Sequence, residues 1–118
     1  MAEYDLKTSK AMLESGRYLY VAFTSQQSIE KILKAYFLKI KNETPPYIHN
    51  LPRLISFCEL DNELTNEQKD FNGELNLYYI EARYTEDLIE LSKTTNKEKA
   101  HYIFNKTMEF YNWLFPKI

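Results

Sequence analysis

The sequence is poor in the residues that break helices and in the residue that forms covalent cross-links. Its 118 residues include two glycines, four prolines and one cysteine. So few glycines and prolines argue against a fold made of many tight turns, as β-sheet domains are. A single cysteine excludes an internal disulfide and is typical of a protein in a reducing compartment. A chain of this length builds one hydrophobic core, so we expect a single domain over residues 1–118.

Long apolar runs and a strong charge of either sign are absent as well. The longest apolar run, Tyr18 to Phe23, is far too short to span a bilayer. The first seven residues lack the basic and then apolar pattern of a signal peptide. A net charge of −2 gives no general attraction to nucleic acid or to an anionic membrane. We therefore expect a soluble, cytoplasmic protein that does not associate with membranes.

The longest helical signal runs from Tyr18 to Lys41 and contains neither glycine nor proline. At helical spacing one stripe is expected to face the core, and it consists of Ala22, Gln26, Ile29, Leu33, Tyr36 and Ile40. A second face brings Gln27, Glu30 and Lys34 together, so that an amide, an acid and a base share one side. Chemistry along this helix is expected on that second face.

Helices are expected on both sides of this segment. Residues 3–14 are amphipathic, and Ser15-Gly16 should end that helix because glycine tolerates the left-handed cap conformation. The two helices should then pack as an antiparallel pair. Pro45-Pro46 excludes helix from the next connection, and a third helix is expected over residues 51–60.

Capping boxes indicate where the last two helices begin. Thr65 with Gln68 opens a fourth helix, and Thr95 with Glu98 opens the last one. Residues 83–95 have a loose apolar pattern and are expected to form a mostly irregular connection with room for a single helical turn. The expected fold is an all-α, up-and-down bundle of four or five helices.

Residue types that bind metals or attack substrates are sparse. His49, His101 and Cys58 lie on different expected elements, with only Glu98 close to His101, so we expect no metal site. We expect no cofactor either, because two glycines 57 positions apart exclude a glycine-rich phosphate loop. Gly73, inside the fourth helix, is interpreted as a close approach between helices. Cys58 stands among apolar residues and is expected to be buried and inert.

Four features remain that a plain helical bundle does not require. They are Gly16 with Tyr18 at the first corner, the run Gln27-x-x-Glu30-Lys31-x-x-Lys34-Ala35, His49-Asn50-Leu51 at a helix start, and Ala82-Arg83-Tyr84 at a helix end. In this order they resemble the HEPN family, small helical bundles named for a proposed role in nucleotide binding. The resemblance covers the chain from Leu6 to about Leu114.

The resemblance has two departures. The family usually has proline after Arg-Tyr, whereas this chain has Thr85. Many HEPN proteins are ribonucleases that use an arginine followed by a histidine after four to six residues. Counted from Arg83, those positions hold Leu88, Ile89 and Glu90, none of which takes up a proton as imidazole does. We therefore expect no catalytic residues of that kind.

The resemblance implies a nucleotide- or RNA-associated module that forms a homodimer. It also implies a small nucleotidyltransferase as partner, in a two-component or toxin-antitoxin-type system. Lys34 and Arg83 would hold phosphate, Tyr84 would stack or orient, and Glu30 would fix Lys34. The candidate ligand-binding residues are Glu30, Lys34, Arg83, Tyr84, Gln27 and His49.

Purely structural roles for these residues stay open. A solvated i,i+4 ion pair accounts for Glu30 and Lys34 without a ligand, and a histidine before a helix often makes only local hydrogen bonds. Two further functions also stay open: a metal-independent ribonuclease toxin with a non-standard site, and a non-catalytic dimerisation scaffold.

Overall fold

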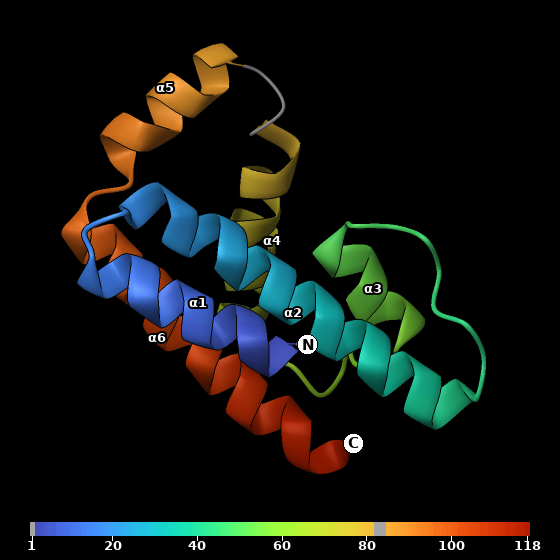
Figure 1. The fold of residues 1–118 in the computed structure, drawn as a ribbon. Coiled ribbons are helices and arrows are strands. Elements are labelled where there is room, and N and C mark those ends of the chain that lie inside the picture. Colours follow the sequence, from blue (N-terminus) through green and yellow to red (C-terminus); the bar gives the residue numbers. More distant parts are fainter. Residues whose placement is uncertain (1, 82–84) are drawn as a thin grey trace.

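Helix α2, Tyr18–Lys41, is the centre of the fold, and every other helix contacts it (Figure 1). The predicted stripe of α2 is confirmed over most of its length. Ala22, Ile29 and Leu33 are fully buried, and Gln26 is buried beside them. Tyr36 is half-buried, and the prediction for Ile40 is wrong: its side chain is 41% exposed. Leu38, near the same end of α2, is exposed as well.

The structure is a computed structural model that describes residues 2–81 and 85–118. Over these residues it contains six α-helices and a terminal 3₁₀ turn, and no strand. The helices are α1 Ala2–Glu14, α2 Tyr18–Lys41, α3 Leu51–Phe57, α4 Asn66–Glu81, α5 Thr85–Thr94 and α6 Lys97–Leu114, and the 3₁₀ turn is Phe115–Lys117. The all-α prediction is confirmed, and the six described helices exceed the four or five expected. None of the described helices is both long and apolar enough to cross a membrane.

Helices α1 and α2 form the predicted antiparallel pair (Figure 1). The corner between them turns at Gly16, whose φ of +80° is the left-handed conformation that glycine adopts without strain. Small side chains allow the two helices to come close: the hydroxyls of Ser9 and Ser25 lie 3.1 Å apart and are fully buried. Helix α6 packs against both α1 and α2.

Helix α3 is shorter than expected. Asn50 is its N-cap, and the Asn50 side chain accepts a hydrogen bond from the backbone N–H of Arg53 at 3.0 Å. The helix ends at Phe57, and Glu59 has a positive φ of 57°, so the prediction of helix as far as Leu60 is wrong. The preceding connection, which contains Pro45-Pro46, is not helical, as predicted.

The two predicted capping boxes have different outcomes. At α4, the Thr65 backbone N–H donates to Gln68 Oε1 at 2.8 Å and the Gln68 N–H donates to Thr65 Oγ1 at 3.1 Å, which confirms the prediction. At α6 the cap is Asn96, which accepts from the N–H of Lys99 at 2.9 Å. Thr95 is instead buried, so its prediction as the cap is wrong.

Two further predictions, for Gly73 in α4 and for residues 85–94, are wrong. A Cβ added at Gly73 meets nothing within 4 Å, so Gly73 does not mark a close approach between helices. Residues 85–94, expected to be mostly irregular, form the ten-residue helix α5. Figure 1 shows α5 reaching away from the rest of the bundle, and its main helix contacts are with α2 and α4. This helix was hard to predict because it is short and holds only three apolar residues, Leu88, Ile89 and Leu91.

Candidate functional site

The candidate site is built around the carboxylate of Glu30 on α2, whose side chain is 13% exposed. One of its oxygens accepts a hydrogen bond from Lys34 Nζ at 3.1 Å. Both oxygens lie close to Nδ1 of His49, at 3.0 and 2.9 Å. Gln26 Nε2 donates to the same carboxylate at 3.3 Å. We call Gln26, Glu30, Lys34 and His49 the Glu30 cluster.

Helical spacing supplies three members of the Glu30 cluster. Gln26, Glu30 and Lys34 follow one another at intervals of four along α2, which places them on one side of the helix. This side lies at the border of the buried stripe, since Gln26 is only 2% exposed whereas Lys34 reaches solvent. The carboxylate is therefore held between a buried amide and an ammonium that is largely buried but reaches solvent.

The fourth member comes from the connection before α3. Gln26 Nε2 also donates to the backbone carbonyl of His49, at 3.3 Å. Immediately after His49, Asn50 caps α3, and the backbone N–H of Leu51 donates to Asn76 Oδ1 on α4 at 2.9 Å. These bonds fix the start of α3 against both α2 and α4, so the imidazole is held in place by backbone as well as side-chain contacts.

Two tyrosines complete the surroundings of His49. The ring of Tyr79, on the last turns of α4, lies 4.6 Å from the imidazole centroid with an interplanar angle of 30°. Tyr47, which follows Pro45-Pro46, meets the imidazole edge-on at 5.7 Å and is 91% exposed. Lys34 Nζ lies 5.9 Å from the Tyr47 ring centroid. A cation and aromatic surfaces therefore share one exposed region.

The charges of the Glu30 cluster set its chemistry. One carboxylate faces one ammonium and one imidazole, so the cluster is neutral when His49 is neutral and carries one positive charge when His49 is protonated. In the neutral ring, an Nδ1–H that donates to Glu30 leaves the lone pair on Nε2. This arrangement can hold an anion beside Lys34, and it can also take up a proton at Nε2.

The structure brings together three of the six predicted site residues, Glu30, Lys34 and His49. Gln27 is exposed, and the amide that bonds Glu30 belongs to its neighbour Gln26. Arg83 and Tyr84 lie outside the described residues.

Sequence reasoning assigned Gln26 to the core and did not select Tyr47 or Tyr79. The i,i+4 spacing from Gln26 to Glu30 was a usable signal for the first of these. No local pattern distinguishes the two tyrosines from the other eight.

The remaining candidates for chemistry lie elsewhere. Cys58 is buried as predicted, its Sγ–H donates to the carbonyl of Leu33 at 3.4 Å, and burial raises the pKa of the thiol to about 11. Within residues 2–81 and 85–118, no three His, Cys, Asp or Glu side chains gather closely enough to hold a metal ion.

Comparisons with known proteins agree with the architecture. A sequence model described as HEPN domain matches residues 1–118, the whole chain. Among solved structures, the chain is similar to the crystal structure of TT1696 from Thermus thermophilus, with a TM-score of 0.82. The match covers 99% of this chain and 92% of that one at 19% sequence identity, so this likeness concerns the fold alone. No curated protein matches. On the whole-length family match, the chain belongs to the HEPN domain family.

Proposed function

We propose that the chain is a non-catalytic HEPN module that binds nucleotides or single-stranded RNA at the Glu30 cluster. The observation that carries this proposal is the position of Lys34, whose ammonium is held by Glu30 beside His49 and the exposed ring of Tyr47. A phosphate and a base offer complementary groups to this surface, since the ammonium attracts the phosphate and the ring offers a stacking face.

The carboxylate of Glu30 positions the cation. A free lysine side chain samples many rotamers, whereas Lys34 Nζ is fixed 3.1 Å from a carboxylate that is only 13% exposed. The Glu30 carboxylate interacts with His49 as well as with Lys34. When His49 is protonated, the cluster therefore carries one positive charge that can attract an anion. Binding through a single lysine is weak, which calls for a second cation.

Arg83 is the second cation of the proposal. It stands two residues after Glu81, the last residue of α4, in the Ala82-Arg83-Tyr84 motif that resembles the family. Tyr79, one turn before it in sequence, packs on His49 of the Glu30 cluster. The proposal assigns phosphate binding to Lys34 and Arg83 jointly, with Tyr84 stacking beside them.

A titration of the pure protein with AMP, ATP and a short single-stranded RNA tests this proposal. We expect Lys34→Gln and Arg83→Ala each to weaken binding, because each removes one of the two phosphate-binding cations. Lys39→Gln is the matched control, since it removes one exposed cation from the same helix. Equal affinity of wild type and Arg83→Ala, or equal losses for Lys34→Gln and Lys39→Gln, would count against the proposal.

The proposed partners are a second copy of this chain and a small nucleotidyltransferase encoded beside it, as in two-component or toxin-antitoxin-type systems. Family membership motivates this part of the proposal. Co-expression with the neighbouring reading frames, followed by size-exclusion chromatography and mass measurement, tests it. Co-elution with a nucleotidyltransferase is the expected result, and elution of the chain as a lone monomer would contradict it.

A second candidate function is metal-independent ribonuclease activity at a non-standard site. The observation in its favour is the contact of both Glu30 oxygens with His49 Nδ1, because a carboxylate-oriented imidazole is a general base for a 2′-hydroxyl. RNA cleavage in the presence of a chelator, lost in His49→Gln and Glu30→Gln, would support this function. Intact RNA after incubation with the wild type favours the non-catalytic module.

A further inference from the structure

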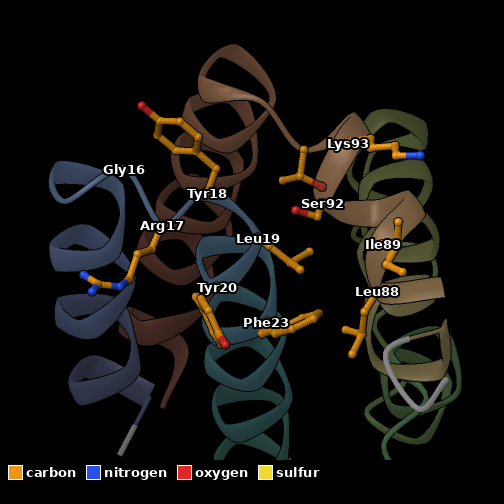
Figure 2. A pocket seen from close by; sticks show the side chains of 11 residues that line it. Gly16, Arg17, Tyr18, Leu19, Tyr20, Phe23, Leu88, Ile89, Ser92 and Lys93 are labelled. Atoms are coloured by element: carbon orange, nitrogen blue, oxygen red, sulfur yellow. The ribbon is translucent and has the colours of Figure 1, made fainter. Parts of the chain in front are cut away.

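A second site lies at the N-terminal end of α2, between its first turns and α5. It is a cavity of about 840 Å³, and Figure 2 shows the side chains around it. The volume falls within the range of about 300–1,000 Å³ that small-molecule sites occupy. The lining residues come mainly from two elements that barely touch each other, so the cavity is a groove between helices rather than a defect of the core.

The middle of the groove is apolar. Leu19 and Phe23 point from α2 toward α5, and Leu88 points back toward them (Figure 2). Ile89 also lines the groove, and its side chain is 51% exposed. Of the three apolar residues on α5, only Leu91 packs against the core, so Leu88 and Ile89 leave apolar surface that an occupant would cover.

The ionisable residues around the groove select the charge of the occupant. Among the side chains that the structure describes, a set without positions 80–85 and 87, no aspartate or glutamate lines it, although the chain carries 17 acidic residues against 15 basic ones. Two cations line it, Arg17 and Lys93, and neither forms an ion pair with any side chain that the structure describes. In Figure 2 their charged groups extend outward on opposite sides of the apolar middle. Exposed side chains of this length reorient within nanoseconds and can turn toward an anion.

We propose that the groove between α2 and α5 binds an amphipathic monoanion, a small molecule with an apolar body and one carboxylate or sulfonate group. The apolar body lies between Leu19, Phe23 and Leu88, where it is removed from water. The acidic group lies at the rim, within reach of Arg17 or Lys93, and the hydroxyl of Ser92 offers it a hydrogen bond there. A neutral or cationic molecule of the same size lacks the interaction with Arg17 or Lys93.

A comparable groove between α1 and α6 provides the control. It has an apolar floor that includes Leu6, Phe104 and Met108, and two lysines, Lys7 and Lys10, line it. It is smaller, at about 400 Å³, and Glu3 also lines it. A molecule that simply adheres to apolar surface beside lysine would not distinguish the two grooves, whereas the proposed ligand prefers the groove between α2 and α5, where no acid is among the described lining side chains.

Fluorescence titration with 8-anilinonaphthalene-1-sulfonate tests the proposal. The wild type is expected to bind the probe. Decanoate should displace the probe, whereas decyltrimethylammonium, which has the same chain length, should not. Ile89→Asp should weaken binding at least about tenfold, because it places a carboxylate among the apolar groups. The double variant Arg17→Gln/Lys93→Gln should weaken binding of the anions while its circular dichroism stays native, since both residues are exposed.

The matched control is Lys7→Gln/Lys10→Gln, which should bind the probe as the wild type does. Equal weakening in the two double variants would overturn the proposal, as would displacement by decyltrimethylammonium. Sedimentation measures the oligomeric state and so tests whether a second copy of the chain, rather than a small molecule, occupies the groove. A wild type that is dimeric and does not bind the probe, together with a monomeric Ile89→Asp, would overturn the small-molecule assignment.

Discussion

Glu30 is the residue on which the proposed nucleotide site depends. Its carboxylate is largely shielded from water, and its oxygens are divided between the ammonium of Lys34 and the imidazole of His49. A carboxylate in this position is stable only while its partners remain, because an unpaired charge at a partly buried site loses hydration without compensation. The same reasoning applies to the two partners if the carboxylate is removed.

We therefore predict that Glu30→Gln destabilises the fold. The neutral amide keeps the shape of the side chain but loses the charge-assisted hydrogen bonds to Lys34 and His49, which we expect to lower the free energy of unfolding by about 1–3 kcal/mol. Urea unfolding at pH 7 measures the change. Glu59→Gln is the control, because Glu59 also pairs with a lysine, Lys41, but is 74% exposed. Equal effects of the two substitutions would show that Glu30 is an ordinary surface residue.

Cys58 provides a second prediction for a single residue. Burial raises the pKa of its thiol to about 11, so the reactive thiolate is rare at pH 8. Iodoacetamide should modify Cys58 slowly in the native protein and rapidly in guanidinium chloride, with the extent of alkylation read by mass spectrometry. Fast labelling of the native protein at pH 8 would be incompatible with a buried thiol.

The raised pKa of Cys58 also predicts how stability changes with pH. The folded state holds the thiol proton more tightly than the unfolded state, so this contribution is complete below a pH of about 9 and is lost as the pH rises toward 11. Cys58→Ala should remove this part of the alkaline decline in the free energy of unfolding.

At the level of secondary-structure elements, the two glycines are predicted to respond oppositely to replacement by alanine. Gly73 lies inside α4 with open space around its missing Cβ, so Gly73→Ala should stabilise the protein by about 0.5–1 kcal/mol. Gly16 has a φ of +80°, and Gly16→Ala should destabilise it by about 1 kcal/mol. Thermal unfolding of both variants measures the difference. Destabilisation by Gly73→Ala would restore the interpretation of Gly73 as a close contact between helices.

Helix boundaries show where sequence patterns suffice. The capping box of α4 was predictable because both of its side chains, Thr65 and Gln68, act within one turn. At α6 two cap-forming residues stand side by side, and local preference does not choose between Thr95 and Asn96. The tertiary structure decides, since Thr95 is buried with its hydroxyl 3.4 Å from that of Tyr78.

Helix α5 was missed for a related reason. Apolar periodicity is read over several turns, and this ten-residue segment holds only three apolar residues, Leu88, Ile89 and Leu91. Its acidic first half and exposed Ile89 therefore resemble a solvated connection.

At the scale of the whole molecule, the assembly of the candidate site could be predicted only in part. The face with Glu30 and Lys34 follows from helical geometry. The contact between His49 and Glu30, which are 19 residues apart in sequence, depends on the path of the connection after α2. It also depends on the hydrogen bond from the Leu51 backbone N–H to Asn76 Oδ1. Periodicity carries no information about such contacts, and the order of motifs that resembles the HEPN family was the useful signal for them.

The charge of the whole molecule leads to a prediction about salt. With a net charge of −2, RNA binding should rest on a few specific contacts rather than on a general attraction. If Lys34 and Arg83 each neutralise one phosphate, the logarithm of the affinity should fall with the logarithm of salt concentration with a slope of about −1.4. Fluorescence anisotropy across a salt series gives the slope. A slope steeper than about −3 would point to a broad basic surface instead.

Amide chemical-shift mapping tests the central claim most directly. A single-stranded hexanucleotide of RNA is titrated into ¹⁵N-labelled protein, and the residues whose amide signals move are identified. The account predicts the largest changes at Glu30, Lys34, Tyr47, His49 and Tyr79, which surround the proposed binding surface. Changes confined to other faces of the bundle, or no changes at all, would contradict it.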